Sequence, residues 1–442
     1  MTLQDLQGYD LVMAITEKAL NEQFALVFQD NTLPQWNAEL SDDGSTIQAT
    51  FGIPRIDLNT PLNRGASLIV PIVAGAYTYY QVKIVSGKPE VTSVSYDLSG
   101  KSFVLTSSLK MLHDTDFHSA DFTVQRLFLD LSDPHLVSRF EIDDIDGQAL
   151  VSITTLLQKY LEQLQKQNNA TFVFGSVKVP NVPETVGPLA PTGGDFSVYS
   201  DPSNPQFNCL NFLLMTDKKL LPTEPTAGIF DHSLVLTNDE ATFIASDYQI
   251  LSKFILPNIV NGLKSKDVDC PISVDSFNLS HNPAKATLKE NVPFKGCSFT
   301  KLDVYISNNE IAMDIEYRKK GHIGPAITIT GIANLSNYVS IYVENGELKY
   351  KTRQTDIKVS SDQDNLAVRI ILDILTAGFL EIGYKVVTDA VKHAVNNLLK
   401  DNGFSNALTN AMACVELPAK SLFEYSNVQL PANFMLDVTL KN

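Results

Sequence analysis

The residues best suited to chemistry in this sequence are those of the segment MLHDTDFHS, namely His113, Asp114, Asp116 and His118. Imidazole and carboxylate groups are common ligands of Zn²⁺ and common general acids and bases. The two histidines are five residues apart, so they face opposite sides of a strand and are about 140° apart on a helix. Neither geometry brings both imidazoles to one ion. We therefore interpret the segment as a solvated turn and expect no metal site.

A second cluster is acidic and comprises Glu141, Asp143, Asp144 and Asp146. Its composition is that of a calcium-binding loop, with Gly147 as the glycine of the turn. In that register the first and twelfth loop positions are Ile142 and Ile153, which cannot bind a cation. Capping of a following helix, with negative charge at its N-terminus, explains the run better.

Sequence motifs with a fixed catalytic spacing are absent. The chain contains no G-x-S-x-G, G-x-x-x-x-G-K-[ST], G-x-G-x-x-G or H-E-x-x-H. We therefore assign no catalytic residue, expect no cofactor and predict a protein that is not an enzyme. The alternative, an enzyme with an unrecognised site, requires Asp116, His118 or the carboxylates of 141–146 to converge in one cleft.

Composition narrows the function classes further. The chain has 442 residues, 44% of them apolar and 19% charged, with a formal net charge of −16. This acidic balance disfavours nucleic-acid binding, which needs clustered Lys and Arg. The four cysteines form no C-x-x-C pair, so we expect reduced and mostly buried thiols.

The N-terminal residues MTLQDLQGYD lack a basic region followed by an apolar region, so no Sec-type signal is visible. We expect a cytoplasmic protein as synthesised, with release by another route left open. No clean run of 18 apolar residues predicts a transmembrane span. A basic patch at a predicted hairpin tip (Arg318, Lys319, Lys320 and His322) is either a solvated loop or a peripheral contact with anionic headgroups.

Hydrophobic periodicity predicts two similar halves, each with a helix, a run of strands, a second helix and a closing strand. The expected helices are 8–29, 147–168, 247–263 and 365–400, and the expected strand runs are 36–140 and 272–357. Pro257 should end or kink the third helix. A Pro- and Gly-rich stretch begins at Pro180. We expect an N-terminal domain at 1–182, a connector with bridging strands at 183–245 and a C-terminal domain at 246–442.

The predicted helix 365–400 has no proline and is apolar on all sides in its first half. Arg369 and Asp373 lie inside that half at i,i+4, where they could pair, and each is costly in hydrocarbon. The rest of the protein, and not a bilayer, should therefore surround this helix. Gly378 and Gly383 disfavour a helix and mark the place where we expect the closest approach of a sheet or a ligand.

Several segments in chain order resemble a known family. They are the opening QGYDLVMAITEKALNEQ and then RLFLDLSDPHL, FVFGSVKV and HSLVLTNDEATFIASDYQILSKFILPNI. They resemble the TULIP-superfamily proteins encoded beside clostridial neurotoxins, the OrfX proteins and their companion called P-forty-seven. The resemblance runs through the whole chain, although its patterns are short.

The resemblance implies an α+β protein of bacterial type, built from elongated tandem TULIP-like units. In each unit a highly curved antiparallel β-sheet wraps around a long α-helix. It also implies binding of a lipid or another hydrophobic ligand, and an accessory role beside toxin-cluster proteins made by neighbouring genes. The family supplies no catalytic residues and no ligand motif that could be transferred to this chain.

These observations leave two hypotheses. The first is a non-enzymatic protein that binds a lipid or another apolar ligand; the second is a structural protein with filled cores that acts in a multi-protein complex. An apolar tunnel and an apolar core use the same residue types, so the sequence does not separate them. If a tunnel exists, we expect it to be lined by Val12, Ile15, Ala19, Ile371, Leu375, Phe379 and Ile382.

Overall fold

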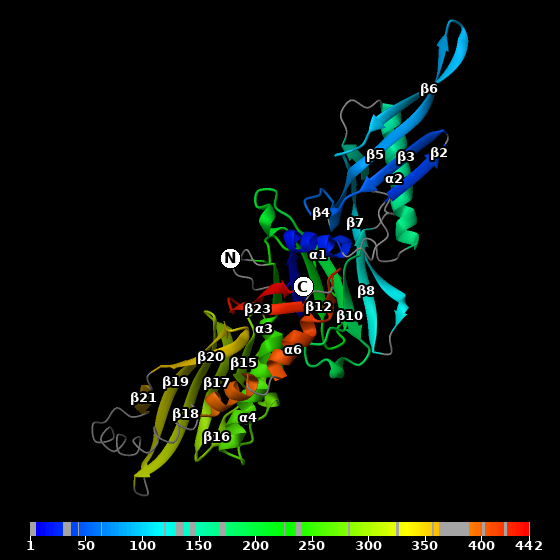
Figure 1. Cartoon of the computed structure of the whole chain (residues 1–442). Coiled ribbons are helices and arrows are strands. Elements are labelled where there is room, and N and C mark those ends of the chain that lie inside the picture. The colour runs from blue at the N-terminus through cyan, green and yellow to red at the C-terminus, as the bar shows by residue number, and fades with distance from the viewer. Residues whose placement is uncertain are drawn as a thin grey trace.

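A computed structural model shows an elongated α+β molecule with three antiparallel β-sheets along its length (Figure 1). A central sheet lies between two longer sheets at the two ends. The structure describes residues 6–29, 37–42, 44–62, 64–118, 121–129, 137–141, 147–167, 173–224, 226–235, 240–281, 283–323, 327–355, 358–361, 389–399, 403–419 and 422–441.

The central sheet joins segments from the whole length of the chain. Its strand order is β11-β12-β1-β13-β24-β23, and every neighbouring pair is antiparallel. The strands are β1 (Leu11–Thr16), β11 (Gly193–Tyr199), β12 (Cys209–Met215), β13 (Ala241–Ala245), β23 (Leu422–Gln429) and β24 (Phe434–Lys441). The predicted connector thus supplies bridging strands, while the domain boundaries at 182 and 245 stay a prediction.

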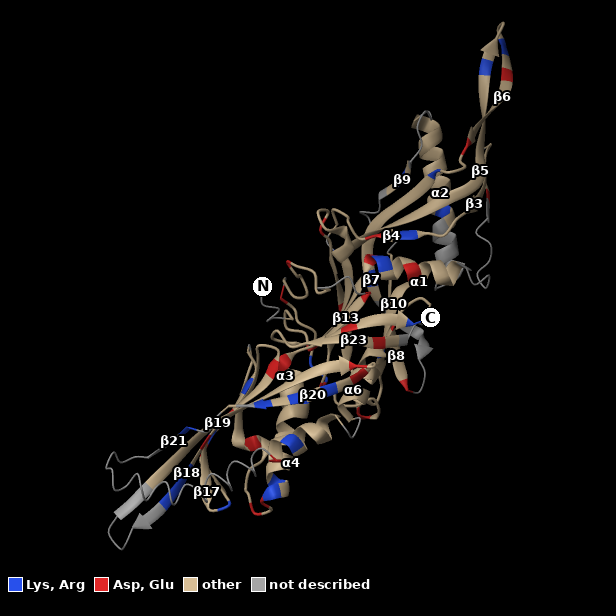
Figure 2. Cartoon of the chain, turned by 60° about the vertical axis from the view of Figure 1, so that its left-hand side comes forward, with Lys and Arg blue, Asp and Glu red and all other residues tan. Residues whose placement is uncertain are grey.

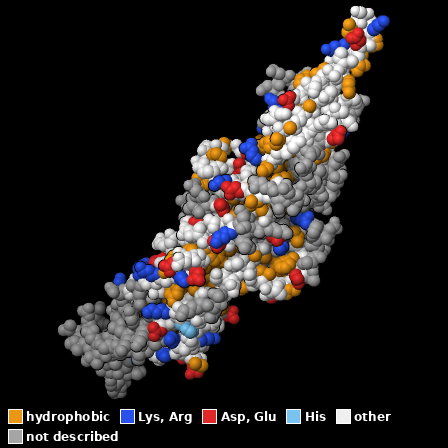
Figure 3. Space-filling view, in the orientation of Figure 1, with side chains coloured by type: hydrophobic (Ala, Val, Ile, Leu, Met, Phe, Trp, Pro, Cys, Tyr) orange, Lys and Arg blue, Asp and Glu red, His pale blue; other side chains and the backbone are white. Residues whose placement is uncertain are grey.

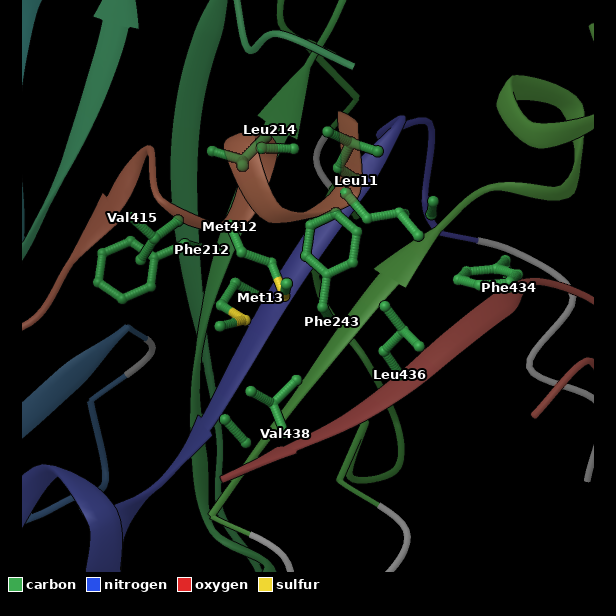
Figure 4. Close-up of a cluster of buried hydrophobic side chains, with 14 of the residues drawn as sticks. Leu11, Met13, Phe212, Leu214, Phe243, Met412, Val415, Phe434, Leu436 and Val438 are labelled. Carbon is green, nitrogen blue, oxygen red and sulfur yellow. The ribbon is translucent and has the colours of Figure 1, made fainter. Parts of the chain in front are cut away.

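Both faces of this sheet are buried. Met13, Phe212 and Phe243 lie on the face covered by the helix α6 (Gly403–Met412), within the large core that continues into both end sheets (Figure 4). Val12, Leu213 and Ile244 lie on the opposite face, in a second apolar cluster. Alternate residues of β1 therefore enter different cores, as the two-residue period of a strand requires.

The predicted helix 8–29 is wrong over its first part. Residues 11–16 form β1, paired with β12 on one side and β13 on the other, and the helix α1 spans only Glu17–Gln29. A strand buried on both faces is a continuous apolar run, and it lacks the alternation that distinguishes a strand from a buried helix.

The N-terminal sheet has the strand order β2-β3-β5-β7-β8-β10-β22, with β4 and β6 paired to β5, and β9 paired to β7. Its strands are β2 (Asn37–Asp42), β3 (Ser45–Phe51), β4 (Arg55–Asp57), β5 (Gly65–Val85), β6 (Lys88–Asp97), β7 (Ser102–His118), β8 (Phe122–Leu129), β9 (Val137–Glu141), β10 (Val173–Pro180) and β22 (Val415–Glu416). The helix α2 (Gly147–Gln167) packs beside β2, β3 and β9.

Several predictions for this half are confirmed, among them the strand run, α2 and the closing strand β10. The predicted turn at 113–118 is wrong, because the backbone of β7 continues through His118 and pairs with β8 across a bulge. Long strands tolerate polar residues where a bulge re-aims the chain. The acidic run from Ile142 to Asp146 lies outside the described residues.

The C-terminal sheet has the order β14-β15-β17-β18-β19-β20, with β16 paired to β17 and β21 paired to β19. Its strands are β14 (Phe277–Ser280), β15 (Lys285–Leu288), β16 (Val292–Phe294), β17 (Cys297–Ser307), β18 (Glu310–Ile323), β19 (Ile327–Glu344), β20 (Glu347–Gln354) and β21 (Lys358–Ser361). The basic segment from Arg318 to His322 lies near the β18–β19 hairpin end, as predicted. Asn345 and Gly346 form the tight turn between β19 and β20, with φ of 55° and 75°.

The third predicted helix contains Pro257 without ending there. It is built from α3 (Asp247–Ile250), a π-helical turn η3 (Leu251–Ile255) and α4 (Leu256–Lys266). A proline has no N–H to donate and its ring collides with the preceding turn. The wider π turn just before Pro257 accommodates both effects. Three short 3-10 helices complete the described elements: η1 (Pro183–Thr185), η2 (Pro205–Phe207) and η4 (Val274–Ser276).

The predicted helix 365–400 is described only at its end, where residues 389–399 are helical. The buried residues there form an apolar stripe along one side of the helix: Ala390, Val391, Ala394, Val395 and Leu398. This end packs against α4 so closely that a Cβ on Gly262 would lie 2.4 Å from the carbonyl oxygen of Ala390. Gly378 and Gly383 lie outside the described residues.

A buried carboxylate ties the N-terminal segment to the second half of the chain. Asp10 is 6% exposed and accepts hydrogen bonds from Thr216 N (3.0 Å), Thr216 Oγ1 (2.9 Å), Lys219 Nζ (2.7 Å) and Gln249 Nε2 (2.8 Å). Burial by itself raises the pKa of Asp10, but the hydrogen bonds from Lys219, Thr216 and Gln249 together outweigh it and lower the pKa. Asp10 is therefore held as a carboxylate at the junction of the central sheet and α3.

Candidate functional site

A groove of about 780 Å³ lies between α2 and the N-terminal sheet. We call it the α2 groove. Its described lining comes from the start of β3, the stretch 77–82 of β5, and the first three turns of α2. The groove lies where β3 stops pairing with β5, at Ser45 and Tyr79. Beyond that point β5 continues with β6 alone on its other side.

Aromatic and aliphatic side chains form the base of the α2 groove. Tyr77 is almost fully buried, and its ring stacks on Tyr79 at a centroid distance of 5.7 Å. Tyr79 in turn stacks on Tyr96 of β6 at 6.2 Å, with planes only 3° apart. Ala149 and Leu156 close the base from the side of α2. Tyr77, Ala149 and Leu156 are at most 6% exposed, so the apolar surface that stays open to a ligand comes mainly from Tyr79 and from Val151 of α2.

The rim of the groove is polar. Gln148, Ser152 and Thr155 lie at i, i+4 and i+7 on α2 and thus share one helical face. Ser45 and Gln81 line the opposite wall. Ser45 Oγ accepts a hydrogen bond from Tyr77 Oη at 3.2 Å, and Gln81 Nε2 donates to Tyr79 Oη.

Among the described residues that line the α2 groove, none carries a charge. Burial raises the pKa of Tyr9, Tyr160 and Tyr317, but none of these tyrosines lines the groove. Hydroxyl and amide groups can hydrogen-bond a polar ligand but offer no strong base or nucleophile. The described lining thus presents apolar groups and uncharged hydrogen-bonding groups.

Metal binding receives no support in the part of the chain that the structure describes, where no three His, Cys, Asp or Glu residues gather around one point. The side chains of His113, Asp114, Asp116 and His118 are outside the described set. All four cysteines are free; Cys209, Cys270 and Cys414 are buried and Cys297 is half-buried. The predicted reduced thiols are thus confirmed.

The residues predicted to line a tunnel fall into two groups. Val12, Ile15 and Ala19 are fully buried, Val12 on one face of the central sheet and the other two in the large core. They do not line the α2 groove, and their role in ligand binding stays a prediction. Ile371, Leu375, Phe379 and Ile382 lie outside the described residues.

A second cavity, of about 510 Å³, lies beside the connector. Pro183, Pro188 and Ala190 line it together with charged residues. Lys253 and Asp217 pair with each other across its wall. Glu184 and Lys218 also line it, so this cavity carries charges of both signs, unlike the described lining of the α2 groove.

Sequence reasoning missed the α2 groove, although two signals pointed to it. The tyrosines Tyr77, Tyr79 and Tyr80 stand in one strand, and small polar residues recur on one face of α2. The missing information is that these two elements, some 70 residues apart, lie side by side. That proximity depends on tertiary packing, which local patterns do not encode.

The fold is that of an all-antiparallel α+β protein with sheets at both ends of a central sheet, and solved structures share it. The structure of P47 from Clostridium botulinum A2 matches with a TM-score of 0.66 over 99% of this chain and 98% of that chain, at 15% sequence identity. P47 of Clostridium botulinum E1 matches with a TM-score of 0.63 over 98% of this chain and 99% of that chain, also at 15% identity. The predicted resemblance is therefore confirmed at the level of the fold.

A structure of lipopolysaccharide binding protein aligns over 98% of this chain, but with a TM-score of only 0.31 and 13% identity, so no functional argument rests on it. No protein-family model and no curated protein match the sequence. In the part of the chain that the structure describes, no helix is long and apolar enough to cross a membrane.

Proposed function

We propose that this chain is a non-enzymatic binding protein for an amphipathic, lipid-class ligand with an uncharged polar head, held in the α2 groove. The observation that carries the proposal is the pairing of an apolar aromatic base with a neutral hydroxyl and amide rim. A cavity of about 780 Å³ is within the range of ligand pockets. The apolar part of the ligand covers Tyr79 and Val151, and its head faces Ser152 and Thr155.

The neutral rim determines which ligands are disfavoured. A phosphate or carboxylate entering the α2 groove gives up water and meets no described cation there. That loss is not compensated, so an anionic head is rejected relative to a neutral one of the same size. Glycerol, amide and glycosyl heads match the donors and acceptors that the rim presents.

The proposal includes the arrangement of helix and sheet within each of the two units. Each end sheet curves around a helix, α2 in the first unit and the helix ending at 399 in the second. A ligand in either unit then lies between helix and sheet, as in the α2 groove. The rival function is a structural partner in a protein complex with both units filled, and it predicts no uptake of lipid at all. A role beside products of neighbouring genes remains a prediction of either function.

A fluorescent monoacylglycerol and the fatty acid of the same chain length, titrated into the purified chain, test the proposal. We expect saturable binding of the neutral probe and at least about tenfold weaker binding of the anionic one. Ser152→Trp places an indole in the α2 groove and should abolish binding. Val268→Trp adds the same indole at a position that is 88% exposed and does not line the groove, and should leave binding intact. Equal binding by both variants, or no binding by the unaltered chain, contradicts the proposal.

A further inference from the structure

The β5–β6 hairpin projects from the end of the molecule that the N-terminal sheet forms, beyond the other described elements there (Figures 1 and 2). The strands remain paired from Ala76 and Asp97 to Val85 and Lys88. Ser86 and Gly87 close the turn with φ of 54° and 78°. Positive φ at both turn residues matches the right-handed strand twist and keeps the two strands together to the tip.

The two faces of this hairpin differ in chemistry. Cross-strand pairing places Tyr80, Val82 and Ile84 on the same face as Pro89 and Val91. Val82, Ile84 and Val91 are 66%, 78% and 68% exposed, which is unusual for aliphatic side chains gathered in one place. Lys83, Lys88 and Glu90 lie on the other face. Figure 3 shows hydrophobic side chains along the hairpin and basic side chains at its tip.

The hairpin adjoins the α2 groove. Tyr80 and Val82 belong to the apolar hairpin face and are also among the residues that line the groove. Val151 of α2, which is 66% exposed, lies on the opposite wall. The base tyrosines Tyr77 and Tyr79 lie on the other face of β5, so the groove and the apolar hairpin face meet along this part of β5.

We propose that the β5–β6 hairpin is a membrane-docking element that enters the headgroup layer of a lipid bilayer containing anionic lipid, and that it brings the mouth of the α2 groove to that surface. Exposed aliphatic residues next to lysines are the combination that interfacial elements use, since the lysine stems reach headgroup phosphates while the aliphatic groups leave water. The inference rests on the proposed function, because a lipid carrier must exchange its ligand with a membrane.

The distribution of charge favours docking through the tip of the hairpin. The whole chain carries a net charge of −16, so an anionic bilayer repels most of its surface. Lys83 and Lys88 flank the hairpin turn and outnumber the single acid Glu90 of that segment. The same lysines disfavour edge-to-edge pairing with a second copy of the hairpin, because like charges would meet there.

Flotation with vesicles of phosphatidylcholine and phosphatidylglycerol tests the proposal. Ile84→Thr combined with Val91→Thr keeps β-branched side chains but removes aliphatic surface, and neither residue lines the groove. We expect the double variant to bind vesicles about tenfold more weakly or worse. The control, Leu220→Thr combined with Val268→Thr, alters aliphatic residues that are 90% and 88% exposed elsewhere, and should bind as the unaltered chain does.

Two further measurements complete the test. Lys83→Gln combined with Lys88→Gln should weaken binding to these vesicles at low salt and change it little at high salt. An Ile84→Trp variant should shift its emission to shorter wavelength on vesicles, whereas Val268→Trp should not. Vesicle binding that is equal in the hairpin and control variants overturns the proposal. The proposal is also overturned if the unaltered chain self-associates through the hairpin, so that the double variant loses self-association and keeps its vesicle binding.

The test of membrane docking can fail or succeed independently of the test of ligand binding in the α2 groove. Uptake of the neutral probe in vesicle-free solution should be the same in the double variant and in the unaltered chain. Vesicle binding without probe uptake would leave the docking element standing and remove the lipid-carrier function. Probe uptake without vesicle binding would support the lipid-carrier function and rule out the docking element.

Discussion

Replacing Asp10 by Asn is the most direct perturbation of the junction between the two halves. The two side chains have nearly the same shape, so the change leaves no cavity and isolates the charge. The carboxylate accepts four hydrogen bonds from three residues, Thr216, Lys219 and Gln249. An amide presents one oxygen and one NH₂ group, so some of these donors must face another donor.

The structure sets the size of the effect. A hydrogen bond to a charged group contributes about 1.5–3 kcal/mol, and Asp10→Asn removes one or two such bonds. Lys219 is 39% exposed at its side chain and can turn to water, which reduces the loss. We therefore expect the free energy of unfolding to fall by about 2–4 kcal/mol at pH 7.

The effect should depend on pH in a defined direction. The folded pKa of Asp10 is lowered below the value of 3.8 taken for an unperturbed Asp. Its stabilisation is therefore complete above the unfolded pKa and is lost as pH falls through the folded pKa. The difference in unfolding free energy between the unaltered chain and Asp10→Asn should narrow as the pH is lowered below about 4.

Urea unfolding followed by circular dichroism and by tyrosine fluorescence provides the assay, and coincidence of the two curves checks that one transition is measured. Glu90→Gln, on the exposed hairpin, is the control and should change stability by less than about 0.5 kcal/mol. A loss below about 0.5 kcal/mol for Asp10→Asn at pH 7, or a difference that stays constant on acidification, would refute the reasoning.

Two further predictions concern packing and thiol chemistry. Gly175→Ala should lower the free energy of unfolding by about 1–3 kcal/mol in the same urea assay, because a Cβ there would lie 2.6 Å from Phe212 Cζ. An unchanged midpoint of urea unfolding would contradict this close packing. Burial raises the pKa of Cys209 to about 11 and that of Cys414 to about 12. Both thiols stay protonated at pH 8, so a thiol reagent should modify half-buried Cys297 first. Peptide mass spectrometry would show the order of labelling. Faster labelling of Cys414 than of Cys297 would contradict it.

Most local elements of this fold could be predicted from the sequence. The helix α2 has an apolar stripe at helical spacing, and the Asn345-Gly346 turn has residues suited to positive φ. These features depend on a few neighbouring residues, which is the range over which periodicity and turn chemistry act. The four thiols were predictable for the same kind of reason, since their spacing excluded the common metal and redox motifs.

Three features could not be predicted because they depend on distant parts of the chain. The strand β1 is fixed by β12 and β13, about 200 residues away, and its uniform apolar sequence suits a helix equally well. The π turn before Pro257 is likewise a response to tertiary packing that holds the helix together across a proline. The α2 groove has the same origin, because its two walls come from separate segments.

Photocrosslinking with a diazirine-bearing monoacylglycerol, read by peptide mass spectrometry, tests the central claim most directly. The α2 groove predicts crosslinks on peptides covering residues 77–82 and 148–156, and their loss in Ser152→Trp. Crosslinks confined to the predicted helix around Ile371 and Phe379, or labelling unaffected by Ser152→Trp, would contradict it.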